Sequence, residues 1–321
     1  MKGSIRIDPI TIDPMTIDPI NSFSSSVVES SILRLDKLHP IVSGNKWFKL
    51  RYYIEDAIAN KATTIASFGG PYSNHLVALA FAAKENNLKS IGYVRATKED
   101  LITPSLEEAL AYGMQLEFMG RTNFQAIKND LLKANKNIDN NNNNHNNEGI
   151  NDGFTIEQGV YYIDEGGYGE LGAKGAATIL NEHCKNFTTI IAAVGTGTML
   201  TGLIQAAAPH QNVIGIPILK NEASIETEIK TLLKDSTKPF TLLHSFHQGG
   251  YAKTNPALFA FMNQLWETEK IPSDIVYTGK LLMAIDSLLK ENYFKAGTKL
   301  LVIHSGGLQG NRSLPSGTLL Y

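Results

Sequence analysis

Short apolar runs alternate with amphipathic segments along most of this 321-residue chain. Apolar or β-branched runs of four to eight residues predict strands, and apolar residues at helical spacing predict helices. Strands are expected at 63–68, 90–95, 115–119, 160–163, 188–194, 212–218, 240–246 and 299–304. Helices are expected at 75–84, 104–113, 170–180, 199–208, 222–235, 256–269 and 281–291.

This alternation predicts an α/β protein with two open, mostly parallel sheets and flanking helices. The expected organisation is an N-terminal arm over 1–30, a large domain from 31–52 and 165–321, and a small α/β domain over 53–164. In sheets of this kind, ligands bind beyond the carboxyl ends of the strands. The loops that follow the strands are therefore the places to look for chemistry.

Two segments do not fit the alternation. Residues 7–21 repeat a five-residue unit, "IDPIT-IDPMT-IDPIN", whose regularly spaced prolines forbid a helix and predict an extended arm on the surface. The Asn-rich tract from Asn135 to Asp152 has too few apolar residues to offset its ordering entropy. We expect a mobile loop there, and we expect replacement of residues 140–147 by a short linker to change stability little.

Composition narrows the function classes. A net charge of −2 and a pI near 6.5 give no basis for nucleic acid or an anionic membrane as a partner. The single cysteine, Cys184, cannot form an intramolecular disulfide and is interpreted as structural. There is no apolar run of about 20 residues and no secretory signal, so a cytoplasmic location is expected.

The loops after two predicted strands carry the clearest signals. "SFGGPYSNH" places Ser73 and Asn74 at a helix start, where they could cap the helix, bind a ligand, or do both. "AAVGTGTMLTG" offers backbone N–H groups to an anion. A Walker loop would need Gly-Lys-Ser/Thr, and the dinucleotide fingerprint would need glycine where Leu200 stands. A cradle for a single phosphate is favoured.

Further glycine pairs lie in the loops at 166–167, 249–250 and 306–307, and Tyr277 follows the predicted strand "DIV". Many glycine-rich loops with few charges suggest a flat, neutral ligand that carries one phosphate. Lys46 follows a Gly-Asn pair at a predicted helix start. Its position alone suits a solvated first-turn residue better than a nucleophilic amine.

In combination, these motifs resemble a known family. "GNKWFKL", "PYSNH", "DEGGYGELGAKGA", "GTGTMLTG", "VYTGK" and "HSGG" occur in the order found in the 1-aminocyclopropane-1-carboxylate deaminase and D-cysteine desulfhydrase family. The resemblance covers about residues 32–312. It implies the tryptophan-synthase-β fold, pyridoxal 5'-phosphate as cofactor, a small amino acid as substrate and a homodimer.

The resemblance also implies residue roles and reverses the interpretation of Lys46, which becomes the Schiff-base lysine. Asn74 is implied beside the pyridine 3-hydroxyl, and Ser73 in substrate carboxylate binding or proton transfer. Tyr277 is implied to pack on the pyridine ring, and Tyr251 to be a second active-site tyrosine. The other implied cofactor-binding residues are Lys49, Gly195, Thr196, Gly197, Thr198, Met199 and Ser305.

The implied activity is β-elimination from a D-cysteine-like substrate, giving pyruvate, sulfide and ammonia. Alternatives are 1-aminocyclopropane-1-carboxylate deamination and a non-catalytic cofactor-binding protein. The cyclopropane deaminases have a glutamate after the ring-packing tyrosine, where this chain has Thr278, and a leucine where it has Ser305. Hydroxyls beside the ring nitrogen leave a weaker electron sink, which favours β-elimination over ring opening. Phe48 replaces a family arginine and puts substrate identity in question.

Overall fold

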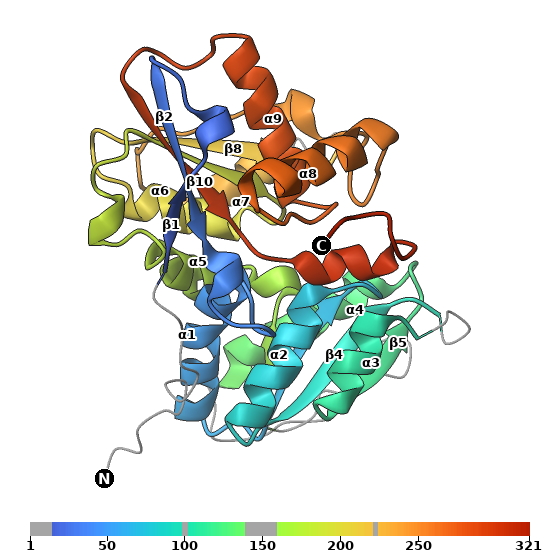
Figure 1. The fold of residues 1–321 in the computed structure, drawn as a ribbon. Helices are drawn as coiled ribbons and strands as arrows, with labels where there is room; N and C mark the ends of the chain where they lie inside the picture. Colours follow the sequence, from blue (N-terminus) through green and yellow to red (C-terminus); the bar gives the residue numbers. More distant parts are fainter. Residues whose placement is uncertain (1–14, 98–101, 139–158, 221–223) are drawn as a thin grey trace. The chain divides into compact units, whose positions relative to one another are not determined.

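The computed structural model describes residues 15–97, 102–138, 159–220 and 224–321. The chain divides into two compact units (Figure 1). The small unit is Leu50–Tyr168, and the large unit combines the described residues up to Lys49 with Gly169–Tyr321. Within the described ranges, no helix is long and apolar enough to cross a membrane.

The large unit contains a six-stranded sheet in the order β1-β2-β10-β7-β8-β9. All neighbouring strands are parallel except β1 and β2, which are antiparallel. In chain order the strands are β1 (Ile17–Pro19), β2 (Val28–Arg34), β7 (Thr189–Val194), β8 (Asn212–Pro217), β9 (Thr241–Leu242) and β10 (Thr298–His304). The helices are α5 (Glu170–Ala177), α6 (Thr198–Ala206), α7 (Ser224–Leu233), α8 (Pro256–Glu269) and α9 (Thr278–Lys290).

Helices cover both faces of this sheet. Apolar side chains of β7, β8 and β10 form one core with α8 and α9, including Ile214, Val302, Met262 and Ile285. On α6, Leu200 packs against β8 so closely that a Cβ on Gly215 would lie 2.6 Å from its Cδ2 atom. The burial of most strands on both faces explains their almost uninterrupted apolar sequences.

The small unit contains a parallel four-stranded sheet in the order β5-β4-β3-β6. The strands are β3 (Thr64–Gly69), β4 (Lys89–Arg95), β5 (Met114–Met119) and β6 (Val160–Ile163). The helices are α2 (Asn74–Glu85), α3 (Pro104–Ala111) and α4 (Phe124–Ile138), and α1 (Asn45–Ala59) runs across the unit boundary in the chain. Stacked Phe68, Tyr93 and Tyr162 form part of its core.

The predicted fold class is confirmed, with local corrections. The strand expected at 240–246 is limited to β9 and is followed by a 3-10 turn, His244–Phe246. Tyr277 follows a turn, in which the buried carboxylate of Asp274 accepts hydrogen bonds from the backbone of "VYT". The helix α4 was not predicted, and the first residues of the Asn-rich tract, 135–138, complete it.

The N-terminal repeat also differs from the expected arm. Its third unit forms the edge strand β1, and Asp18 binds Arg34 at 3.1 Å and Lys37 at 2.8 Å. Proline is tolerated at the end of an edge strand, because no partner there requires its missing N–H group. Residues 7–14 of the repeat and 139–152 of the Asn-rich tract lie outside the described residues.

Candidate active site

The first turn of α1 presents Lys46 and is packed against the loop that follows β10. The backbone N–H of Asn45 donates to the Ser305 carbonyl at 3.1 Å. Gly44 has a φ of +67°, and a Cβ there would lie 1.9 Å from the same oxygen. Only glycine allows both this backbone angle and this close approach. The Gly-Asn pair therefore fixes where α1 begins.

The side chain of Lys46 is half-buried, and its Nζ donates to Asn45 Oδ1 at 2.8 Å. Burial lowers the pKa of Lys46 to about 8, and the negative charge of Asp274 opposes this shift. Burial, together with the charge of Lys46, also lowers the pKa of Lys49 well below its usual value. With this pKa, about a tenth of Lys46 is the neutral amine at pH 7, a far larger fraction than for an ordinary lysine.

The loop after β7 forms the N-terminal end of α6 and meets the first turn of α1. Gly197 has a φ of +81°, and a Cβ there would lie 2.8 Å from Ile229 on α7. The hydroxyls of Thr196 and Thr198 are 3.0 Å apart. Asn45 Nδ2 lies 3.5 Å from the Met199 sulfur, so the N-terminal end of α6 lies beside the same side-chain amide that binds the Lys46 amine.

Tyr277 packs on this loop, and Tyr251 packs on Tyr277. A Cβ on Gly195 would lie 3.1 Å from Cε1 of Tyr277, so the Tyr277 ring packs directly over the backbone of the loop. The Tyr251 ring stands edge-on to Tyr277, with ring centroids 6.4 Å apart and an interplanar angle of 73°. Tyr251 is 51% exposed, whereas Tyr277 is partly buried. The large unit therefore brings Lys46, the phosphate-type loop and both tyrosines together.

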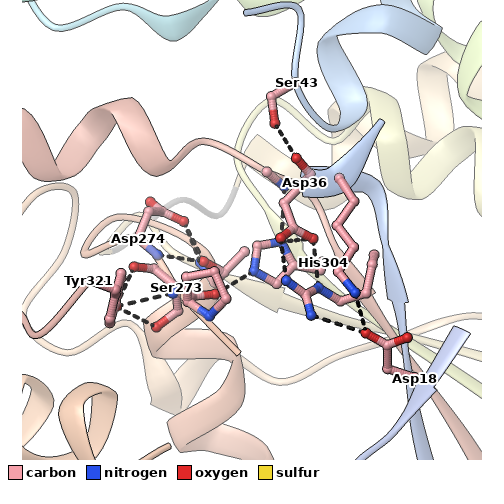
Figure 2. A network of polar contacts seen from close by, with 12 residues as sticks. Asp18, Asp36, Ser43, Ser273, Asp274, His304 and Tyr321 are labelled. Carbon is pink, nitrogen blue, oxygen red and sulfur yellow. Dashed lines mark hydrogen bonds and ion pairs between the residues drawn. The ribbon is translucent and has the colours of Figure 1, made fainter. Parts of the chain in front are cut away.

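Asp274 is the main residue of this region that sequence reasoning missed (Figure 2). Its fully buried carboxylate accepts backbone hydrogen bonds from Val276, Tyr277 and Thr278 at 2.8–2.9 Å. The Thr278 hydroxyl donates to it at 2.6 Å and accepts from the Asp274 backbone at 2.7 Å. The Thr278 hydroxyl, expected beside the cofactor ring, is therefore bound to Asp274.

A second polar group supports the ends of β2 and β10 (Figure 2). His304 Nε2 is 2.7 Å from the Pro272 carbonyl, and its Nδ1 is 3.3 Å from Asp36. Arg34 donates twice to Asp36, at 2.8 and 2.6 Å. Against the effect of burial, His304 and Arg34 hold the pKa of Asp36 below its usual value. This group joins the end of β2 to the end of β10, and β10 leads directly into Ser305.

Ser305 itself is buried, and its carbonyl holds the start of α1. Ser73 and Asn74 belong to the small unit, at the end of β3 where α2 begins. Ser73 accepts a hydrogen bond from the Leu76 backbone at 3.3 Å, so it is a helix cap. The other predicted site residues belong to the large unit.

Comparison with known proteins identifies the family. Residues 14–306 match the family model described as "Pyridoxal-phosphate dependent enzyme". The chain belongs to this family. This pyridoxal-phosphate-dependent enzyme therefore uses pyridoxal phosphate as its cofactor, as the resemblance of its motifs predicted.

The enzyme is similar to several individual proteins. It is 26% identical to a protein of Cryptococcus neoformans named "Probable 1-aminocyclopropane-1-carboxylate deaminase", over 82% of this chain and 80% of that one. The crystal structure of an ACC deaminase homologue matches with a TM-score of 0.76 and 20% identity, covering 94% of this chain and 92% of the other. A hydrogen sulfide-producing enzyme from Fusobacterium nucleatum matches with a TM-score of 0.64 and 15% identity, covering 95% and 98%. The two structures show a shared fold.

Proposed function

We propose that this enzyme catalyses β-elimination and deamination of a small amino acid, with D-cysteine or a close analogue as substrate. D-cysteine and water would give pyruvate, hydrogen sulfide and ammonia. The observation that carries the proposal is the Lys46 amine, with its lowered pKa, beside the glycine loop that begins α6. A nucleophilic amine next to an anion-binding helix end suits a phosphorylated aldehyde.

The geometry of the large unit fits the cofactor. A Cβ on Gly195 would lie 3.1 Å from Tyr277 and one on Gly197 would lie 2.8 Å from Ile229, so at these two positions the loop can offer a ligand only backbone N–H groups. These groups and the N-terminal end of the nine-residue helix α6 would hold the phosphate, together with the threonine hydroxyls and Lys49. The Tyr277 ring, already packed over Gly195, would form one wall for the pyridine ring. We assign Asn74 to the 3-hydroxyl group from the motif resemblance.

When bound, the cofactor supplies an electron sink for the substrate's α-carbon. Lys46 would hold the cofactor covalently, and its amine, once displaced by the substrate amine, would take the α-proton. Ser73 would bind the substrate carboxylate or transfer a proton. Tyr251, the most exposed of these side chains, would face the substrate.

The preference for a D-cysteine-like substrate depends on what residue 278 can offer the cofactor ring. Thr278 stands where the cyclopropane deaminases have a glutamate, and its hydroxyl is bound to Asp274. The Asp274 carboxylate in turn accepts four hydrogen bonds and is fully buried. Residue 278 therefore offers the pyridine nitrogen of the cofactor neither a carboxylate nor an available hydroxyl, which leaves the ring a weaker electron sink. A weaker sink favours a substrate with an acidic α-proton and a good leaving group.

The second candidate, 1-aminocyclopropane-1-carboxylate deamination, is favoured by the name of the Cryptococcus relative. The deciding experiment measures kcat/KM for D-cysteine, L-cysteine and 1-aminocyclopropane-1-carboxylate by release of 2-oxo acid. We expect D-cysteine to be turned over fastest. Faster turnover of the cyclopropane amino acid would overturn the proposal in favour of the second candidate. From the resemblance we also propose a cytoplasmic homodimer.

A further inference from the structure

A second buried lysine of the large unit has no part in the proposed chemistry. Lys280, in the first turn of α9, is fully buried. Its ammonium group donates to the backbone carbonyls of His247, at 3.1 Å, and Gly250, at 2.5 Å. Burial lowers the pKa of Lys280 to about 8, against the opposing charge of Asp274. A buried charge persists only where its hydrogen bonds are made, so these carbonyls define its role.

The segment that receives these hydrogen bonds has an unusual backbone. Gln248 and Ala252 have φ values of +49° and +53°, which are uncommon for residues with a side chain. Between them, Gly249 and Gly250 have φ values of +89° and +112°. The left-handed conformation costs energy at Gln248 and Ala252, although not at the glycines, and it persists only where the surroundings hold it. The Lys280 ammonium group is a contact from outside the segment that binds it at two points.

The same segment leads directly into Tyr251. Tyr251 follows Gly250 in the chain, and its ring packs edge-on against Tyr277. Tyr277 immediately precedes α9, so Lys280 and Tyr277 belong to the same helical turn. The first turn of α9 thus contacts the Tyr251 loop twice, through the ring of Tyr277 and through the ammonium group of Lys280.

We propose that Lys280 is a positioning residue that holds the His247–Gly250 segment so that Tyr251 stays against Tyr277 and faces the substrate. This inference rests on the proposed function, because it treats Tyr251 as a residue that contacts the substrate. Lys280 itself is not a second nucleophile, since its hydrogens are directed at backbone carbonyls.

The test begins with Lys280→Met, which keeps the length and apolar stem but removes the donors. Lys290→Met is the matched control, because Lys290 lies at the exposed end of the same helix and pairs with Asp286. In holoenzyme of Lys280→Met, we expect amide hydrogen exchange of residues 248–253 to accelerate at least about tenfold. Exchange should be unchanged in Lys290→Met, and both variants should keep the cofactor absorbance. Unchanged exchange in Lys280→Met would overturn the inference.

A double-mutant cycle separates positioning from a general structural role. We expect Lys280→Met to lower kcat/KM roughly tenfold, mainly through KM, and to cost almost nothing further when added to Tyr251→Ala. Additive losses would overturn the inference, because Lys280 would then act independently of Tyr251. If Lys280→Met does not fold, Lys280→Arg is the alternative, because it keeps the charge but is too long to bind both carbonyls. We expect it to give the same faster amide exchange and the same coupling to Tyr251→Ala, each smaller than in Lys280→Met.

The exchange experiment needs no turnover, so it is independent of the proposed function. If the wild-type enzyme turned over no amino acid, the proposed function would be wrong, but amide exchange of residues 248–253 would still test the role of Lys280. If the wild-type enzyme were active and Lys280→Met left that exchange unchanged, only the role of Lys280 would be wrong.

Discussion

Lys46 in the first turn of α1 and Lys280 in the first turn of α9 make an instructive pair. Burial lowers the pKa of each to about 8, and the charge of Asp274 opposes both shifts. Their surroundings differ in what the amine can reach. Lys46 is half-buried and bonded to the side-chain amide of its neighbour, whereas Lys280 is fully buried and bonded to two backbone carbonyls.

The comparison shows that a lowered pKa does not by itself mark a catalytic lysine. An amide side chain can rotate away and release the Lys46 amine to a reactant. The backbone carbonyls of His247 and Gly250 can release the Lys280 amine only if the segment that carries them changes its conformation. The same lowered pKa therefore fits the covalent chemistry proposed for Lys46 and the loop positioning proposed for Lys280.

The largest effect is expected from removing Lys46, the proposed nucleophile. Lys46→Ala should lose the covalent bond to the cofactor and several orders of magnitude in turnover, as expected when a covalent catalyst is deleted. Lys280→Met should keep that bond. Borohydride reduction followed by peptide mapping measures it directly. A cofactor still attached to a lysine in Lys46→Ala would show that the two lysines have been assigned the wrong roles.

Asp274 acts on both lysines, and its removal should have the next largest effect. Asp274→Ala leaves three backbone N–H groups and a hydroxyl without their acceptor, so we expect a loss of about 3–5 kcal/mol in the free energy of unfolding. Asp286→Ala, on the exposed side of α9, is the control and should cost less than about 1 kcal/mol. Denaturant unfolding measures both. Equal losses would show that the buried position of Asp274 is unimportant.

Asp274 and Lys280 show the limit of what the sequence could predict. Alternating apolar segments sufficed for the α/β class, and the order of the glycine loops sufficed for the family. Asp274 and Lys280 look like ordinary surface residues in "SDIVYTGK", because nothing in the sequence reveals that both will be buried. The segment 240–246 has strand-like composition, yet only Thr241–Leu242 form a strand, because β-propensity depends strongly on the structural context.

The role of Lys46 can be sharpened through pH. Only the neutral amine attacks the cofactor aldehyde, and the fraction of neutral amine rises with pH through its pKa. The rate of covalent cofactor uptake by the apoenzyme should therefore rise about tenfold per pH unit below pH 8 and level off above it. In Asp274→Asn the opposing negative charge is lost, so the midpoint should move to lower pH. A wild-type rate that keeps rising to pH 10 would contradict the assigned pKa of Lys46.

The smallest effect separates two roles for Thr278. Thr278→Val keeps the shape but removes the hydroxyl that donates to the Asp274 carboxylate and accepts from its backbone N–H. A buried N–H group without an acceptor should cost about 1–3 kcal/mol in the free energy of unfolding, while Thr278→Ser should cost less. Because that hydroxyl faces Asp274, the absorbance of the bound cofactor should be the same in both variants. A changed cofactor spectrum with unchanged stability would show instead that Thr278 contacts the cofactor ring, as its place in the motif first suggested.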